Sequence, residues 1–132
     1  MDFYCVNFKD LIISADDTEI YLDMEIEKAK QAKALAFKIL HGYGSHGRGG
    51  KICINLRKCL LKLRNKGKIK DFFIGSEWAI ENPKCFEFLK TCKFASLDED
   101  IGKQNPGITI VVLWHFLYFF HSLLLMKIEV FF

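Results

Sequence analysis

The pattern of apolar and polar positions along the chain predicts alternating strands and helices. Four short runs have the length and the β-branched or aromatic content of buried strands: 11–14, 35–40, 69–74 and 108–113. Between the first two runs, Leu22, Ile26 and Ala29 are spaced by four and three residues, which places them on one face of a helix. The capping side chains of 15–18 precede this helix, which we expect to continue to Ala34.

The second half of the pattern predicts one long helix and one short helix. After the second run, one helical face gathers five apolar side chains: Ile52, Leu56, Cys59, Leu60 and Leu63. Gly67 is a typical helix stop, and Pro83 stands at a tolerated first-turn position of a helix over 83–92. The order is therefore β-α-β-α-β-(α)-β. It predicts an α/β fold, a two-layer sandwich with a mixed four-stranded sheet.

The size of the chain fits a single domain. With 132 residues, of which 51% are apolar, it is long enough to bury one core. We expect the domain to cover 1–113 and an apolar tail to cover 114–132. The five cysteines include no C-x-x-C pair, and no apolar signal segment opens the chain, so we expect reduced thiols and a cytoplasmic protein. No cluster of metal ligands stands out. We therefore expect no cofactor, with a divalent metal left open.

The apolar tail has several interpretations. Residues 108–126 form a run of 19 residues without formal charge, which is long enough to cross a bilayer as a helix. The first six are better used as the last strand. That leaves 13 residues, interrupted by His115 and His121. This length favours a docked helix, an interfacial segment or an extension beyond the native end of the domain over a membrane span. The two histidines are six residues apart and do not have metal-ligand spacing.

The segment LHGYGSHGRGGK, residues 40–51, is the main candidate for a functional site. It holds five glycines and follows the second predicted strand, where open α/β sheets place ligands. Glycines permit close backbone approach, and free amides at a helix N-terminus favour an anion. Nine basic residues without an acidic one lie between 42 and 70: Arg48, Lys51, Arg57, Lys58, Lys62, Arg64, Lys66, Lys68 and Lys70. This block indicates a polyanionic partner such as DNA or RNA, although a solvated helix face has the same pattern.

Individual residues of this segment have competing interpretations. Lys51, Lys58 and Lys62 share one helix flank and, with Arg48, would contact phosphates, whereas Arg57 and Arg64 fall elsewhere. Tyr43 either stacks on an unpaired base or packs over its own loop. His41 is either a general acid or base or a strand cap that hydrogen-bonds its own loop. His46 either contacts phosphate or has no role. The spacing does not match a nucleotide-binding P-loop.

The motif H-G-x-G at His41-Gly42-Tyr43-Gly44, with the small residue Ser45 and the glycines at 47, 49 and 50, resembles the Smr domain family. The glycine-led closing strand at 107–113 matches the family too. The resemblance covers about residues 8–113 and implies an α/β sandwich, nucleic-acid binding and, for some members, DNA or RNA nicking. The family's first strand normally ends in L-D-x-H-G. The corresponding position here is 11–15, so Ile12 replaces the aspartate and Ser14 the histidine, with Asp16 and Asp17 just beyond as candidates to substitute in part.

Two functions follow from these patterns. The first is a MutS-related, Smr-like DNA- or RNA-binding domain and candidate endonuclease, a hydrolase of phosphodiester bonds in structured or branched substrates. The second is a non-catalytic adaptor or a tail-anchored interaction protein. For the first, the catalytic candidate is His41, and the phosphate-binding candidates are Gly42, Tyr43, Gly44, Ser45, His46, Gly47, Arg48, Gly49, Gly50, Lys51, Lys58 and Lys62. Residues 77–104 are assigned no functional role, and the oligomeric state receives no prediction.

Overall fold

The computed structural model describes residues 2–11, 14–43 and 48–114 of the chain. These residues form four strands and four helices: β1 (Phe3–Asn7), α1 (Phe8–Leu11), α2 (Thr18–Gln31), β2 (Ala36–Leu40), α3 (Arg48–Asn65), β3 (Asp71–Ile74), α4 (Pro83–Thr91) and β4 (Ile108–Val112). Short 3₁₀ turns complete the order: η1 (Ala15–Asp17), η2 (Gly75–Glu77) and η3 (Ala95–Leu97).

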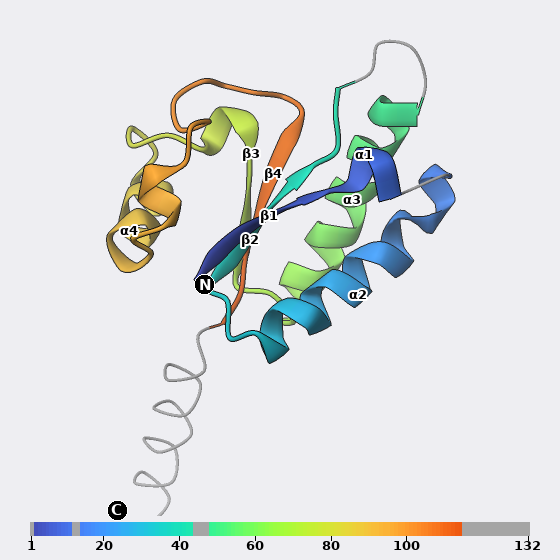
Figure 1. The fold of residues 1–132 in the computed structure, drawn as a ribbon, viewed down its shortest axis with the longest axis horizontal. Coiled ribbons are helices and arrows are strands. Elements are labelled where there is room, and N and C mark those ends of the chain that lie inside the picture. Colours follow the sequence, from blue (N-terminus) through green and yellow to red (C-terminus); the bar gives the residue numbers. More distant parts are fainter. Residues whose placement is uncertain (1, 12–13, 44–47, 115–132) are drawn as a thin grey trace, which may run out of the picture.

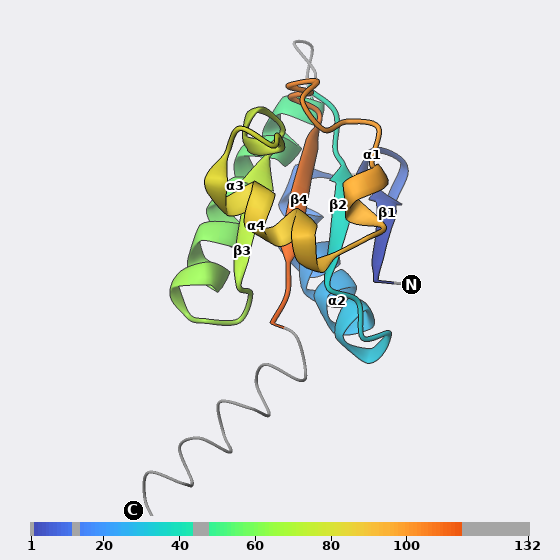
Figure 2. The same cartoon turned by 90° about the vertical axis from the view of Figure 1, so that its left-hand side faces the viewer.

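The four strands form one mixed sheet in the order β1-β2-β4-β3 (Figure 2). β1 runs parallel to β2, whereas β4 is antiparallel to both β2 and β3. The register pairs Asn7 with Leu40 and Leu40 with Ile108. The end of β1, the end of β2 and the start of β4 therefore lie side by side at the same end of the sheet. The predicted α/β class and the mixed four-stranded sheet are confirmed.

Helices α2 and α3 cover one face of the sheet and form the predicted two-layer sandwich with it (Figure 1). The stripe of Leu22, Ile26 and Ala29 is buried, as its spacing predicts, and faces a second stripe on α3. Phe37 and Ile39 of β2 point into the same cluster. α3 ends at a left-handed glycine: Gly67 has φ +73°, and the amide of Lys68 donates to the Leu63 carbonyl at 2.9 Å.

The segment between β3 and β4, to which the sequence pattern assigns no role, covers the second face of the sheet. Figure 1 shows α4 on the side of the sheet opposite α2 and α3. Trp78 is fully buried there, and its ring lies 6.1 Å from Phe3 and 6.0 Å from Phe73. Because both faces are covered, β4 is buried along its whole length.

The first strand lies earlier in the chain than the pattern predicts. The run 11–14 does not form it: Leu11 ends α1, Ser14 precedes η1, and Ile12 and Ile13 lie outside the described residues. β1 is instead Phe3–Asn7, an edge strand in which only Phe3 is buried. An edge strand that buries few side chains has weak apolar alternation, so a short run of β-branched residues nearby was the stronger signal.

The apolar run near the C-terminus is part of the sheet at its start. Ile108–Val112 forms β4, and Trp114, the last described residue, donates its indole N–H to the Gly67 carbonyl at 3.0 Å. The tail elements predicted for 115–132, with His115 and His121, lie outside the described residues. Within the described ranges, no helix has the length and apolar character that a membrane crossing requires.

Candidate functional site

The candidate site begins where β2 ends, at the end of the sheet where β1 also ends and β4 begins. The backbone amides of His41 and Gly42 both donate to the Gly107 carbonyl, at 3.0 and 3.1 Å. Gly107 opens β4, so these bonds join the start of the H-G-x-G motif to the neighbouring strand. In Figure 1, α1 and the first turn of α3 lie at this same end of the molecule.

The side chain of His41 is buried and holds its own loop. It is 0% exposed, and strand alternation points it toward α3, on the same face as Phe37 and Ile39. Nδ1 lies 2.8 Å from the Gly42 carbonyl, and Nε2 lies 2.9 Å from the Thr109 hydroxyl. Because a carbonyl only accepts, we assign the proton to Nδ1, and Nε2 then accepts from Thr109. This geometry matches the strand-cap interpretation of His41, while its catalytic role stays a prediction.

The surroundings of His41 favour the neutral imidazole. Burial lowers its pKa from 6.5, and the positive charges of Arg57 and Lys9 lower it further. Hydrogen bonding with the backbone of Gly42 and Ile108 opposes this change but does not reverse it. The group is therefore uncharged near neutral pH.

The lowered pKa predicts a pH-dependent stability. The free energy of unfolding should fall as the pH drops below 6.5, because unfolded His41 then takes up a proton that the folded chain does not bind. Above pH 6.5 the neutral imidazole leaves the free energy of unfolding undiminished. Below it, this free energy falls progressively until the pH reaches the lowered pKa of His41 in the folded chain. Urea unfolding at a series of pH values would measure the slope. His41→Gln should flatten it, whereas the control His46→Gln should leave it intact. An unchanged slope in His41→Gln would contradict the assignment.

Gly42 is required by its conformation and by its neighbour. Its φ of +76° is in the left-handed region, and a Cβ at this position would lie 2.6 Å from Cε of Lys9. The aliphatic part of Lys9 therefore packs directly against the backbone of the motif. Sequence analysis did not single out Lys9, because it lay before the expected first strand.

Arg57 also belongs to this site, although helical spacing predicted that it faces elsewhere. Arg57 lies close enough to His41 for its positive charge to lower the pKa of that imidazole. The Nε of Arg57 is buried and has no hydrogen-bond partner among the residues that the structure describes.

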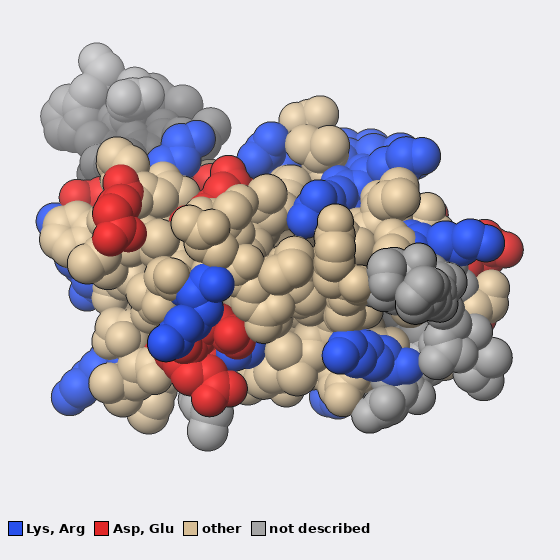
Figure 3. Space-filling view, turned by 90° about the horizontal axis from the view of Figure 1, so that it is seen from above, with Lys and Arg blue, Asp and Glu red and all other residues tan. Residues whose placement is uncertain are grey.

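The outer flank of α3 presents the predicted lysines to solvent. Lys51, Lys58 and Lys62 are all exposed. Figure 3 shows the molecule from above: Lys and Arg side chains lie on both halves of this view, and acidic side chains lie mainly on the half away from α2 and α3. Several predicted site residues cannot be placed. Gly44, Ser45, His46 and Gly47 lie outside the described residues, and of Arg48 and Gly49 only the helical backbone is described. Gly50 lies in the first turn of α3.

The observed first strand changes the comparison with the family motif. At the end of β1 the chain reads Val6-Asn7-Phe8-Lys9-Asp10. If the L-D-x-H-G pattern is placed there, Asn7 takes the aspartate position and Lys9 the histidine position, in place of Ile12 and Ser14. Phe8, in the middle, is buried. On this placement the two motif positions carry an amide and an amine side chain.

A buried charged cluster holds the segment between β3 and β4 on the sheet. Lys38, in the middle of β2, is 4% exposed and donates to Asp98 and Asp100, each at 2.7 Å. Asp98 also accepts from the indole of Trp78 at 2.9 Å. Burial lowers the pKa of Lys38, but the hydrogen bonds to Asp100 and Asp98 outweigh burial and raise it. Lys38 therefore stays charged inside the fold.

The same cluster is linked to the candidate site. Asp100 accepts from the side-chain amide of Asn105 at 3.1 Å, and Asn105 accepts from the Gly107 amide at 2.9 Å. The Gly107 carbonyl in turn accepts from His41 and Gly42. A continuous chain of hydrogen bonds thus runs from Lys38 to the H-G-x-G motif, and it gives residues 98–107 a positioning role.

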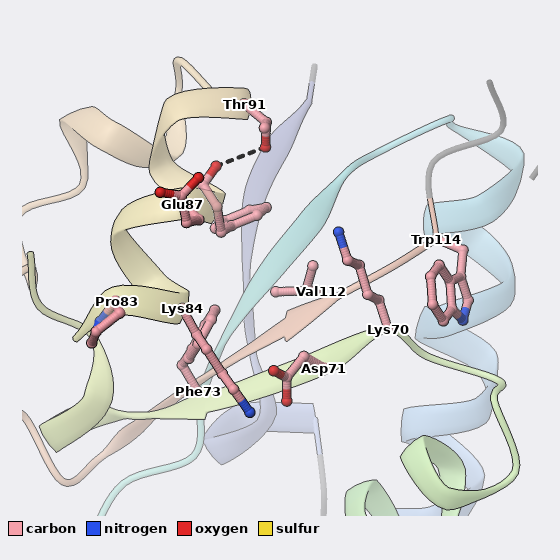
Figure 4. A pocket seen from close by; sticks show the side chains of 10 residues that line it. Lys70, Asp71, Phe73, Pro83, Lys84, Glu87, Thr91, Val112 and Trp114 are labelled. Carbon is pink, nitrogen blue, oxygen red and sulfur yellow. Dashed lines mark hydrogen bonds between the residues drawn. The ribbon is translucent and has the colours of Figure 1, made fainter. Parts of the chain in front are cut away.

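A separate groove lies between α4 and the edge of the sheet (Figure 4). It has a volume of about 660 Å³. Its walls combine the apolar side chains of Phe73, Phe88, Val112 and Trp114 with charged residues such as Lys70 and Glu87. It contains none of the predicted site residues.

The described part of the chain offers no group of three or more histidine, cysteine or acidic side chains that would hold a metal ion. The five cysteines are free, and three of them, Cys53, Cys85 and Cys92, are buried.

Comparison with known proteins gives a likeness of fold. The structure resembles the Smr domain of Thermus thermophilus MutS2, with a TM-score of 0.48 and 15% sequence identity over 86% of this chain and 99% of that chain. No family model matches the sequence, and no curated protein matches it.

Proposed function

We propose that this chain is an Smr-like nucleic-acid-binding domain that contacts the phosphate backbone of DNA or RNA. The observation that carries the proposal is the position of positive charge at the edge of the sheet. Lys9 packs on Gly42, the positive charge of Arg57 acts on His41, and Lys51, Lys58 and Lys62 are exposed on α3. Open strand ends beside a glycine loop are suited to phosphate, and such contacts give affinity without base specificity.

Phosphodiester cleavage is the finer form of this proposal. In the described arrangement both ring nitrogens of His41 are engaged, so general acid or base chemistry requires the imidazole to release Thr109 or Gly42. If the motif is placed at the end of β1, Lys9 takes the family's histidine position and offers a cation to a phosphate in place of an imidazole.

Gel-shift and cleavage assays on the full chain test both levels of the proposal. Supercoiled plasmid, a branched DNA and a structured RNA serve as substrates, each with and without Mg²⁺. A mobility shift without cleavage supports a binding domain, and cleavage that His41→Ala abolishes supports the endonuclease. Cleavage that survives in His41→Ala would refute the role of that imidazole. The absence of any shift at low salt would refute the proposal as a whole.

A second function, a non-catalytic adaptor, is favoured by the groove beside α4. Its walls include the aromatic side chains of Phe73, Phe88 and Trp114, and aromatic residues are enriched where proteins bind one another. Salt separates the two functions, because phosphate contacts weaken steeply with ionic strength and apolar docking does not.

A further inference from the structure

We propose that the edge formed by Tyr43, Lys9 and Arg57 binds a single unpaired nucleotide, with the phosphate on the two cations and the base on the tyrosine ring. This inference rests on the proposed function and specifies its substrate class. It assigns the site to single-stranded segments of DNA or RNA, including those within structured or branched molecules.

The first step is the exposure of Tyr43. Its side chain is 66% exposed, although it follows directly on the buried residues His41 and Gly42. The ring is therefore open to solvent over most of its surface. An exposed aromatic ring stacks with the face of any base, but only when that base is not already paired within a duplex.

The second step is the charge beside the ring. The side chain of Lys9 lies against Gly42, the residue that precedes Tyr43 in the chain. The positive charge of Arg57, on α3, acts on His41, the residue before Gly42. Two cations around the start of the H-G-x-G motif favour a phosphate there.

The third step is rigidity. The backbone on which Tyr43 sits is fixed by the bonds from His41 and Gly42 to Gly107 and by the imidazole of His41. Rigid support lowers the entropy that binding must cost, which favours a defined nucleotide position over loose electrostatic contact. The lysines of α3 then serve the flanking phosphates.

Fluorescence anisotropy with a labelled single-stranded oligonucleotide and the matching duplex tests this inference. Tyr43→Ala should weaken single-strand binding about 5- to 100-fold, the effect of losing one base–aromatic stack, while Tyr43→Phe keeps the ring and the affinity. Duplex affinity should change less than about twofold, since a paired base does not reach the ring. Because Tyr43 is exposed, Tyr43→Ala and Tyr43→Phe should not alter the unfolding temperature.

A double-mutant cycle checks that the ring and the cation hold the same nucleotide. The losses in Tyr43→Ala and Lys9→Met should be non-multiplicative in the double variant, because the two groups share one ligand. Arg57→Met should behave like Lys9→Met. An unchanged single-strand affinity in Tyr43→Ala, an equal loss on the duplex, or fully multiplicative effects would each overturn the inference alone. A chain that binds neither probe would overturn the proposed function as well.

Discussion

Replacing Lys38 with alanine should lower the free energy of unfolding by about 3–5 kcal/mol. The side chain of Lys38 is 5% exposed, and those of Asp98 and Asp100 are 9% and 15% exposed. Removing the ammonium would leave two nearly buried carboxylates without their counter-charge, which is the costly way to break a buried ion pair. The loss should be visible in urea unfolding, with the midpoint moving and the slope unchanged.

A matched variant separates charge from packing. Lys38→Met combined with Asp98→Asn and Asp100→Asn removes all three charges and keeps side chains of similar size. The amide oxygen introduced by Asp98→Asn would still accept from the indole of Trp78, which donates to the Asp98 carboxylate in the native chain. The triple variant should lose clearly less stability than Lys38→Ala. A loss below about 1 kcal/mol in Lys38→Ala would show that the cluster does not hold residues 98–107 on the sheet.

Reversing the charge of Lys58 and Lys62 together should weaken nucleic-acid binding on the order of 100-fold at about 0.1 M salt. Both side chains are exposed on α3, so the substitutions should not unfold the domain. Each phosphate contact releases a counterion from the nucleic acid, and this release drives binding. A lost contact removes that contribution, and the new carboxylates repel the phosphates. Filter binding or anisotropy would measure the change.

The control variant has the same net charge as Lys58→Glu with Lys62→Glu, but its two substitutions lie on another part of the surface. Lys84→Glu with Lys93→Glu alters two exposed lysines of the segment that covers the second face of the sheet. It should leave affinity within about threefold, because at about 0.15 M salt the Debye length is only about 8 Å. Equal losses in the two double variants would indicate that net charge, rather than the surface of α3, governs binding.

Much of the fold follows from local pattern. The stripe of Leu22, Ile26 and Ala29 predicts α2, and the β-branched run at 108–113 predicts β4, because both elements bury a regular set of apolar side chains. β1 does not follow from such a pattern, since it is an edge strand with one buried residue. Because the first strand was predicted at 11–14, the comparison with the family motif used Ile12 and Ser14. The end of the observed strand offers Asn7 and Lys9 for the same two positions.

The candidate site is only partly readable from sequence. The H-G-x-G segment is found because its glycines are unusual, and its place after β2 is confirmed. The burial of His41 depends on Thr109, a partner 68 residues away. Likewise, the approach of Arg57 depends on how α3 crosses the sheet. The roles of Lys38 and Asp100 arise from a pairing between distant segments, which no local pattern reports.

The central claim is that this chain binds nucleic acid through its phosphates, and the salt dependence of affinity tests it most directly. Five described cations at or near the site, Lys9, Lys51, Arg57, Lys58 and Lys62, would give a slope of log affinity against log salt of about −3.5 on a single strand. The variant Lys58→Glu with Lys62→Glu should show a slope shallower by about 1.4. An affinity that stays constant between about 50 and 300 mM salt, or no binding at the lower concentration, would contradict the claim.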